Sequence, residues 1–374
     1  MAAQNMPGLH IGKLAAPTPI VQGGMGIGIS GAGLASAVAD QGGVGVISAV
    51  GLGMLESASR THYHQTNREA LVREIRTARN KTSGIIGVNI MIALSDFDTL
   101  LLGAVDEGVD IIFLGAGLPL HFPEELSPER MRQMHTALVP IVSSAKAAKL
   151  ILKYWSKRFN RVPDGFVLEG PMAGGHLGFT PEQIDDPGYA LHRLLPEVLA
   201  AVAPYEQSRG HKIPVIAAGG VYTGRDIHDF LHLGAAGVQM GTRFVATHEC
   251  DADIAFKQAF VQARQEDLTI IQSPVGLPGR AIENDFLRDV ASGHKKPFTC
   301  PWKCLKTCDY TQSSYCIACA LNQARAGRLK HGFAFAGANA WRVDRIMSVH
   351  ELMHSLIDEY QAAARASETA PAEG

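Results

Sequence analysis

Residues 213–244 read IPVIAAGGVYTGRDIHDFLHLGAAGVQMGTRF, and this stretch decides the fold. It opens with an apolar run that ends in Gly219 and Gly220. It continues with a helical pattern over 225–233 and closes with a second apolar run from Gly237. Two apolar runs joined by a helix are typical of a βαβ unit, whose strands are parallel. The stretch therefore predicts a parallel sheet covered by helices.

The same alternation repeats along the chain, which contains eight apolar, strand-like runs. Runs that are apolar nearly throughout indicate strands buried on both faces, as parallel strands are. Eight such units predict an α/β fold of the (β/α)₈ (TIM) barrel type, with an open doubly wound sheet as the competing architecture. The runs are 19–24, 44–49, 84–91, 110–117, 139–143, 165–170, 213–220 and 237–244.

After residue 250 the alternation stops. We expect residues 1–250 to form the barrel and residues 251–374 to form a helical extension that packs on it. Helices are expected near 252–266 and 349–364, and a cysteine cluster lies at 300–319.

Three longer loops leave the C-terminal ends of expected strands, where barrel enzymes carry their active sites. We expect these loops to cover the site, with tolerated surface loops as the alternative; they are 62–65, 118–130 and 180–192. The small, polar tail 367–374 is expected to be disordered.

The composition excludes several classes of function. The formal net charge of −2 argues against a nucleic acid or a membrane surface as partner. The N-terminus lacks a signal-peptide pattern, and no apolar run is long enough for a transmembrane helix. We therefore expect a cytoplasmic protein with a small-molecule substrate, for which a homodimer is a compatible assembly. Its six cysteines are then thiols or ligands rather than disulfides.

Two glycine-bearing turns follow the seventh and eighth strand-like runs. In (β/α)₈ barrels these loops commonly build a phosphate site, because glycine lets backbone N–H groups approach phosphate oxygens and a helix N-terminus adds positive potential. Gly219, Gly220, Gly241 and the hydroxyl of Thr242 are the candidates. The alternative is a pair of strand-end turns without a ligand.

A histidine lies in a glycine-rich loop after the sixth run, in the sequence GPMAGGHLG of residues 170–178. Such a loop lets the backbone wrap a planar ligand, and an imidazole with an ordinary pKa near 6.5 exchanges protons at neutral pH. We expect His176 to act in catalysis or to contact a cofactor, against the alternative of a structural histidine. Asn89, at the end of the third run, offers an amide for a ring edge. The glycines of 22–28 lack the spacing of a dinucleotide-binding loop, which argues against a Rossmann fold.

Taken together, these motifs resemble the nitronate monooxygenases, also called 2-nitropropane dioxygenases, and the sister branch of FMN-dependent enoyl-acyl-carrier-protein reductases. The resemblance covers about residues 17–290 and implies an FMN-binding barrel. The segments that carry it are PIVQGGMG (19–26), VNIM (88–91), GPMAGGHLGF (170–179), PVIAAGGVYTGRDI (214–227), GVQMGTRF (237–244) and SPVGLPGRAI (273–282).

The resemblance also implies which residues contact the flavin, and it gives His176 the catalytic position. Many members have Gln where this chain has Glu169, whose carboxylate would repel an anionic reduced flavin. Including Glu169 and the glycine turns, the implied contacts are Gly23, Gly24, Met25, Asn89, Glu169, Gly174, Gly219, Gly220, Gln239, Met240, Gly241 and Thr242.

Five of the six cysteines are spaced C-x₃-C-x₃-C-x₇-C-x₂-C over 300–319. This region, with CPWKCLKTCDY, SYCIA and FAGANAWRVDRI, resembles the extension of a subset of NAD(P)H-dependent flavin oxidoreductases. Four thiolates suit an iron–sulfur cluster or Zn²⁺, and Cys300, Cys304 and Cys308 would share one face if this stretch were helical. We expect Cys300, Cys304, Cys308 and Cys316 as ligands and Cys319 as a spare. Buried free thiols or a redox-active pair are the alternatives.

The resemblance implies an FMN-dependent oxidoreductase that oxidises nitronates with O₂ through reduced flavin, with His176 as base or as the group that orients the substrate. One alternative is an NAD(P)H-dependent flavin reductase acting on an enoyl thioester or a quinone. Another is a phosphate-binding barrel without redox chemistry, such as a phosphosugar isomerase, which would be colourless.

Overall fold

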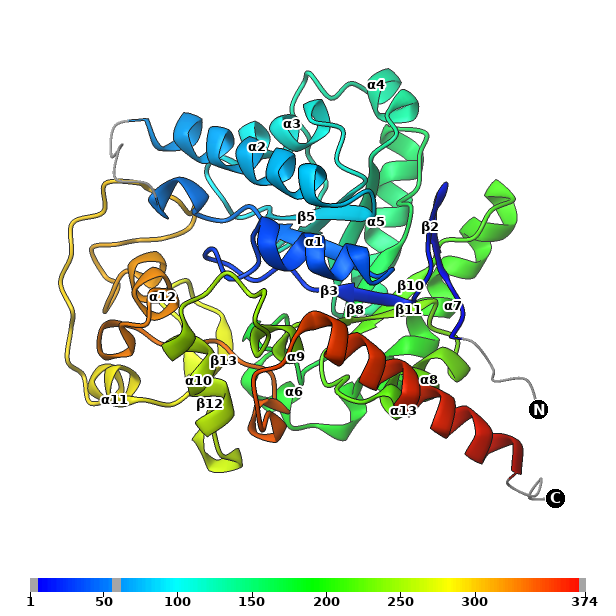
Figure 1. The fold of residues 1–374 in the computed structure, drawn as a ribbon. Coiled ribbons are helices and arrows are strands. Elements are labelled where there is room, and N and C mark those ends of the chain that lie inside the picture. Colours follow the sequence, from blue (N-terminus) through cyan, green and yellow to red (C-terminus); the bar gives the residue numbers. More distant parts are fainter. Residues whose placement is uncertain (1–5, 56–61, 370–374) are drawn as a thin grey trace.

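A computed structural model describes residues 6–55 and 62–369 of the chain, and its centre is a closed barrel of eight parallel strands (Figure 1). Each of the eight runs expected from the sequence overlaps one barrel strand, so the (β/α)₈ barrel is confirmed and the open sheet is excluded. Going around the barrel, the strands are β3 (Ile20–Gln22), β4 (Val44–Ser48), β5 (Ile85–Met91), β6 (Ile111–Gly115), β7 (Ala137–Val142), β8 (Phe166–Glu169), β10 (Val215–Ala218) and β11 (Gly237–Met240).

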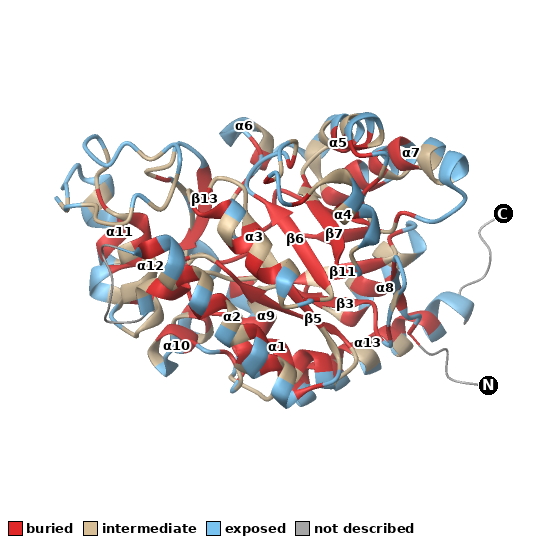
Figure 2. Ribbon diagram, turned by 90° about the horizontal axis from the view of Figure 1, so that it is seen from above, coloured by how far each residue is buried: buried red, intermediate tan, exposed pale blue. Residues whose placement is uncertain are grey.

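The barrel interior is filled by apolar side chains. Figure 2 accordingly shows the barrel strands mostly in the colour of buried residues. Val46, Phe113, Val167 and Ile216 are all almost fully buried in one interior cluster. The ring of Phe113 takes so much room that a Cβ on Gly87 would lie 2.9 Å from it. The interior is therefore a packed core, and a ligand has room only at the ends of the barrel.

Helices surround the barrel and bury their apolar faces on the outer side of the strands. The α-helix that follows β4 starts at Tyr63, so the expected loop 62–65 is mostly its first turn. The expected loop 118–130 includes the start of α4, and the expected loop 180–192 includes all of α6. The helices are α1 (Ala32–Asp40), α2 (Tyr63–Lys81), α3 (Phe97–Asp106), α4 (Pro128–Gln133), α5 (Ala145–Arg158), α6 (Pro181–Ile184), α7 (Leu191–Arg209), α8 (Gly224–His232), α9 (Thr242–Val245), α10 (Ile254–Gln262), α11 (Asp285–Ala291), α12 (Ile317–Arg325) and α13 (Val349–Thr369).

A hairpin of β1 (Leu9–Ile11) and β2 (Leu14–Ala16) precedes the barrel and was not expected from the sequence. Leu9 and Ile11 belong to the interior cluster, so the hairpin closes the end of the barrel at which the strands begin. A ligand can consequently enter only at the C-terminal ends of the strands.

The segments after residue 250 build two additions to the barrel. A sheet of β12 (Leu268–Gln272), β13 (Pro278–Ile282) and β9 (Gly175–His176) lies on the side of the molecule away from both termini (Figures 1 and 2). The long helix α13 packs against α8 on the opposite side. A Cβ on Gly224 would lie 2.2 Å from the carbonyl oxygen of Leu356, so only glycine allows this approach.

The main core contains residues from both sides of position 250, including Leu34 and Leu352. The division into domains at this position therefore stays a prediction. The last helix extends to Thr369, which is further than expected, and residues 370–374 of the predicted disordered tail lie outside the described residues. None of the described helices is long and apolar enough to cross a membrane.

Candidate active site

Two glycine turns meet at the C-terminal mouth of the barrel. Gly219 and Gly220, directly after β10, have φ angles of +88° and +97°, a region that favours glycine. A Cβ on Gly219 would also lie 2.8 Å from the carbonyl oxygen of Gly170. Gly241 and Thr242 follow the neighbouring strand β11. The structure thus brings together the four residues that the sequence assigned to a phosphate.

The residues after β3 complete this side of the mouth. The N–H of Gly23 donates to the carbonyl oxygen of Met240 at 2.9 Å. A Cβ on Gly23 would lie 3.3 Å from the Gln239 side chain, and one on Gly24 would lie 2.4 Å from Cβ of Asn89. A Cβ on Gly241 would lie 3.4 Å from the sulfur of Met25. The three glycines therefore place the backbone beside the implied contacts Gln239, Asn89 and Met25.

A segment from the far end of the chain, residues 333–340, closes over the glycine turns. The N–H of Gly337 donates to Oγ1 of Thr242 at 3.1 Å, and Nδ2 of Asn339 donates to the carbonyl oxygen of Gly220 at 2.7 Å. A Cβ on Gly174 would lie 2.6 Å from the backbone of Ala336. Sequence reasoning assigned no site residue here, although the glycine in the non-periodic stretch FAGANAW was a signal.

The N-terminus of α8 was expected to help bind a phosphate, but its N–H groups already have partners. At the start of α8, a carboxylate oxygen of Asp226 accepts from the N–H groups of Tyr222 and Thr223, and the Glu359 carboxylate of α13 accepts from Gly224 at 2.7 Å. Protein carboxylates therefore occupy the first turn of this helix. The remaining candidates for a phosphate are the glycine turns themselves.

His176 lies in β9, opposite Gly279 of β13. Its Nε2 is 2.8 Å from Oγ of Ser273, with which it shares a hydrogen bond, and its ring meets that of Phe335 edge-on at 5.0 Å between centroids. Burial lowers the pKa of His176 to about 4. The imidazole is therefore neutral at pH 7, which corrects the expectation of an ordinary pKa.

Arg280 is a buried cation that sequence reasoning did not single out. One guanidinium nitrogen donates to the carbonyl oxygens of Pro171 and Ala173, at 2.6 and 2.8 Å. Desolvation lowers the pKa of Arg280. The contacts fix the loop that carries His176, and the arginine in SPVGLPGRAI was the available signal.

Glu169 ends β8 at the mouth. Among residues 6–55 and 62–369, no side chain or backbone group hydrogen-bonds to its carboxyl group. Part of its surface stays accessible from the mouth, but the surrounding protein desolvates the group and raises its pKa to about 7. A carboxyl group that keeps its proton closer to neutral pH can donate a hydrogen bond, as an amide does.

The cysteine-rich segment differs from expectation. The residues between α11 and α12 form no helix, so Cys300, Cys304 and Cys308 do not share a helical face. In the part of the chain that the structure describes, no three His, Cys, Asp or Glu side chains are arranged to hold one metal ion. The geometry therefore does not support the zinc alternative. All six cysteines are free, and Cys250 is buried away from the others in the main core.

Comparisons with known proteins agree with this geometry. A family model described as nitronate monooxygenase matches residues 9–359. The nitronate monooxygenase of Pseudomonas aeruginosa is 34% identical over 201 residues, which cover 52% of this chain and 51% of that protein. FabK from Thermotoga maritima has a TM-score of 0.71 at 26% identity, with 94% of each chain covered.

One further relative is not named as a nitronate monooxygenase. The (3aS,4S,5R,7aS)-5-hydroxy-7a-methyl-1-oxo-octahydro-1H-indene-4-carboxyl-CoA dehydrogenase of Mycobacterium tuberculosis is 29% identical over 277 residues. The match covers 74% of this chain and 66% of that protein, which is slightly less than two thirds of its length. The family match spans the whole barrel and nearly all of the segments that follow it. The chain therefore belongs to the nitronate monooxygenase family, whose members are FMN-dependent oxidoreductases.

Proposed function

We propose that this protein is an FMN-dependent oxidoreductase of the nitronate monooxygenase type, which oxidises nitronates with O₂. The observation that carries the proposal is the meeting of two glycine turns, after β10 and β11, with His176 at one barrel mouth. The opposite end of the barrel is closed by the N-terminal hairpin.

The residues at the mouth fit FMN. Gly219, Gly220, Gly241 and Thr242 would hold the phosphate, because glycine turns expose backbone N–H groups to anions. The remaining implied contacts would hold the ring and ribityl chain: Gly23, Gly24, Met25, Asn89, Glu169, Gly174, Gln239 and Met240. When bound, FMN supplies two-electron redox chemistry that side chains lack.

His176 is the proposed catalytic residue. Its neutral imidazole can take a proton from a substrate carbon or accept a hydrogen bond that orients the substrate. Ser273 fixes the ring through Nε2, and Phe335 shields one side of it from water. The second ring nitrogen is thereby oriented by the fold rather than by the substrate.

A second candidate is an NAD(P)H-dependent flavin reductase that acts on an enoyl thioester or a quinone. Two observations favour it. The Mycobacterium tuberculosis relative is named for a carboxyl-CoA compound, which is a thioester. In addition, Glu169 places an ionisable acid where many nitronate monooxygenases have an amide.

Anaerobic mixing separates the two candidates. The FMN-loaded protein is mixed without O₂ with propyl-2-nitronate, with NADH or with NADPH, and the flavin absorbance is followed. The proposal expects rapid bleaching by the nitronate and O₂ consumption once air is admitted. Bleaching by NADH or NADPH alone, with no response to the nitronate, would replace it by the reductase. The homodimer and the small-molecule substrate stay predictions.

A further inference from the structure

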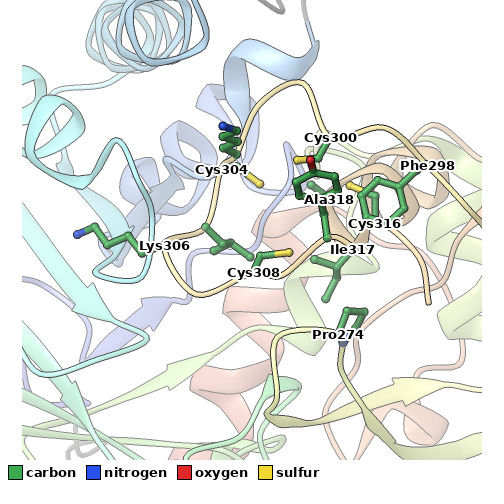
Figure 3. Close-up of a pocket in the computed structure, with 12 residues that line it drawn as sticks. Pro274, Phe298, Cys300, Cys304, Lys306, Cys308, Cys316, Ile317 and Ala318 are labelled. Atoms are coloured by element: carbon green, nitrogen blue, oxygen red, sulfur yellow. The ribbon is translucent and has the colours of Figure 1, made fainter. Parts of the chain in front are cut away.

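Four cysteines line one cavity beside the active site. The cavity has a volume of about 360 Å³ and is bordered by Cys300, Cys304, Cys308 and Cys316. Figure 3 shows their four sulfur atoms turned toward a common space from different parts of the loop and from the start of α12. A spacing of C-x₃-C-x₃-C-x₇-C thus becomes a ring of thiols in three dimensions.

The loop that carries these thiols is held in place although it has little regular structure. Its middle is bound to the segment after β5: the N–H of Ser95 donates to the carbonyl oxygen of Cys304, and the N–H of Lys306 donates to that of Ala93. Its two ends are joined by a bond from the N–H of Lys296 to the carbonyl oxygen of Ser314, at 2.7 Å. A long, irregular loop in a compact protein usually serves a function.

These cysteines do not resemble a cysteine that serves packing. Cys250 is such a residue: it is 4% exposed, lies in the main core, and its thiol donates to the carbonyl oxygen of Ile29. The four cavity cysteines are only half-buried and border open space rather than filling it. Simple burial of free thiols therefore does not account for them.

The lining of the cavity is suited to a group that must be shielded from water. Among the described residues that border the cavity there is no carboxylate, and the ammonium group of Lys306 points away from the sulfur atoms and donates to the carbonyl oxygen of Ile92. The rest of the lining is largely apolar, with Phe298, Leu305 and Ile317. Iron–sulfur clusters are held by cysteine thiolates, and apolar side chains around these four sulfurs would shield such a cluster from water.

We propose that Cys300, Cys304, Cys308 and Cys316 bind one [4Fe–4S] cluster in this cavity. Each of the four irons takes one thiolate, so the sulfurs surround the cluster instead of converging on a point. This agrees with the absence, among the described residues, of three donors placed for a single ion. The volume is also far larger than the roughly 30 Å³ that a single water occupies.

The cavity adjoins the proposed flavin site through two consecutive residues. Pro274 borders the cavity, and Ser273 before it shares the hydrogen bond with His176. A cluster in the cavity would therefore lie directly behind the residue that orients the imidazole. The cluster proposal stands on the cysteine geometry and does not require nitronates to be the substrate.

The test is analysis of iron and acid-labile sulfide in the full-length protein, purified anaerobically and then reconstituted with ferrous iron and sulfide. We expect equal amounts of iron and sulfide, broad visible absorbance in addition to the flavin bands, and an electron paramagnetic resonance signal after reduction. Cys304→Ser and Cys308→Ser should each lose most of the iron. Cys250→Ser is the matched control, because it lies outside the cavity, and should retain it.

Flavin content and circular dichroism show whether each variant is folded. If Cys304→Ser does not fold, Cys308→Ser, at the less buried position, tests the proposal in its place. Three results would overturn the proposal. One is wild-type protein that takes up neither iron nor sulfide. Another is zinc as the bound metal. The third is equal iron in Cys250→Ser and in folded Cys304→Ser and Cys308→Ser.

Discussion

Glu169 shows how one residue can couple the site to pH. Its folded pKa of about 7 lies above the ordinary value of 4.5, because the mouth desolvates the carboxylate. A folded protein that binds more protons than the unfolded chain loses stability as pH rises, so wild-type stability should fall between about pH 4.5 and pH 7 and stay lower above it.

Glu169→Gln removes this ionisation while keeping the shape of the side chain. We expect the FMN-free variant to be more stable than wild type at pH 8, by at most about 3.5 kcal/mol, since the two pKa values differ by about 2.5 and each pKa unit corresponds to about 1.4 kcal/mol. The two proteins should become equal below about pH 4.5. Urea unfolding at several pH values measures the difference, with the exposed Glu197→Gln as control. A pH-independent difference would show that Glu169 ionises normally.

His176 makes a prediction about turnover. His176→Ala should keep FMN but lower kcat by roughly 10²–10⁴-fold, the usual range for loss of a positioned proton acceptor. Ser273→Ala should cost less, because it removes only the group that orients the ring. Since the pKa of His176 is about 4, the wild-type rate should not fall between pH 7 and pH 5.5 through protonation of this residue. Steady-state rates of both variants are the measurement. A His176→Ala rate equal to that of wild type would refute the catalytic role of His176.

At the scale of elements, the sequence predicted all eight barrel strands because each is buried on both faces and reads as an apolar run. It did not predict the sheet of β9, β12 and β13. The strand β9 has only two residues and pairs with β13 about a hundred positions later in the chain. Local periodicity carries no signal for such pairing. The same holds for the cysteine-rich segment, whose course is set by hydrogen bonds to residues distant in the sequence.

The segment 333–340 was missed on the same grounds, and Asn339 tests its part in the site. Its amide donates to the carbonyl oxygen of Gly220 and so holds this segment on the glycine turn. Asn339→Ala should weaken FMN binding about fivefold, as the loss of one hydrogen bond of about 1 kcal/mol implies. Fluorescence titration of the FMN-free protein measures the affinity. The exposed Asn80→Ala on α2 should bind FMN as wild type does, and equal affinity of all three proteins would contradict this role.

At the scale of the whole molecule, the chain returns to the barrel after residue 250 and completes it. The helix α13 packs so closely on α8 that a Cβ on Gly224 would lie 2.2 Å from one backbone atom of α13 and 2.3 Å from another. Sequence patterns revealed both helices but not their contact, because no local signal reports which helices pack together.

Gly224→Ala should therefore force the two helices apart. We expect a loss of unfolding free energy of about 1–3 kcal/mol, the usual cost of overpacking. Because α8 follows the turn of Gly219 and Gly220, the variant should also hold FMN less tightly. Thermal and urea unfolding measure the first effect. Wild-type stability in this variant would mean that α13 is free to move away from α8.

The central claim is that FMN is bound at the barrel mouth by the two glycine turns. It is tested most directly by the flavin absorbance of purified wild type, Gly241→Ala and Gly241→Asp. A Cβ on Gly241 meets only the side chain of Met25, whose sulfur lies at an ordinary contact distance of 3.4 Å, so alanine changes little. An aspartate puts a negative charge where the phosphate is expected. We predict near-stoichiometric FMN in wild type and Gly241→Ala and a colourless Gly241→Asp; colourless wild type, or equal flavin in all three proteins, would contradict the claim.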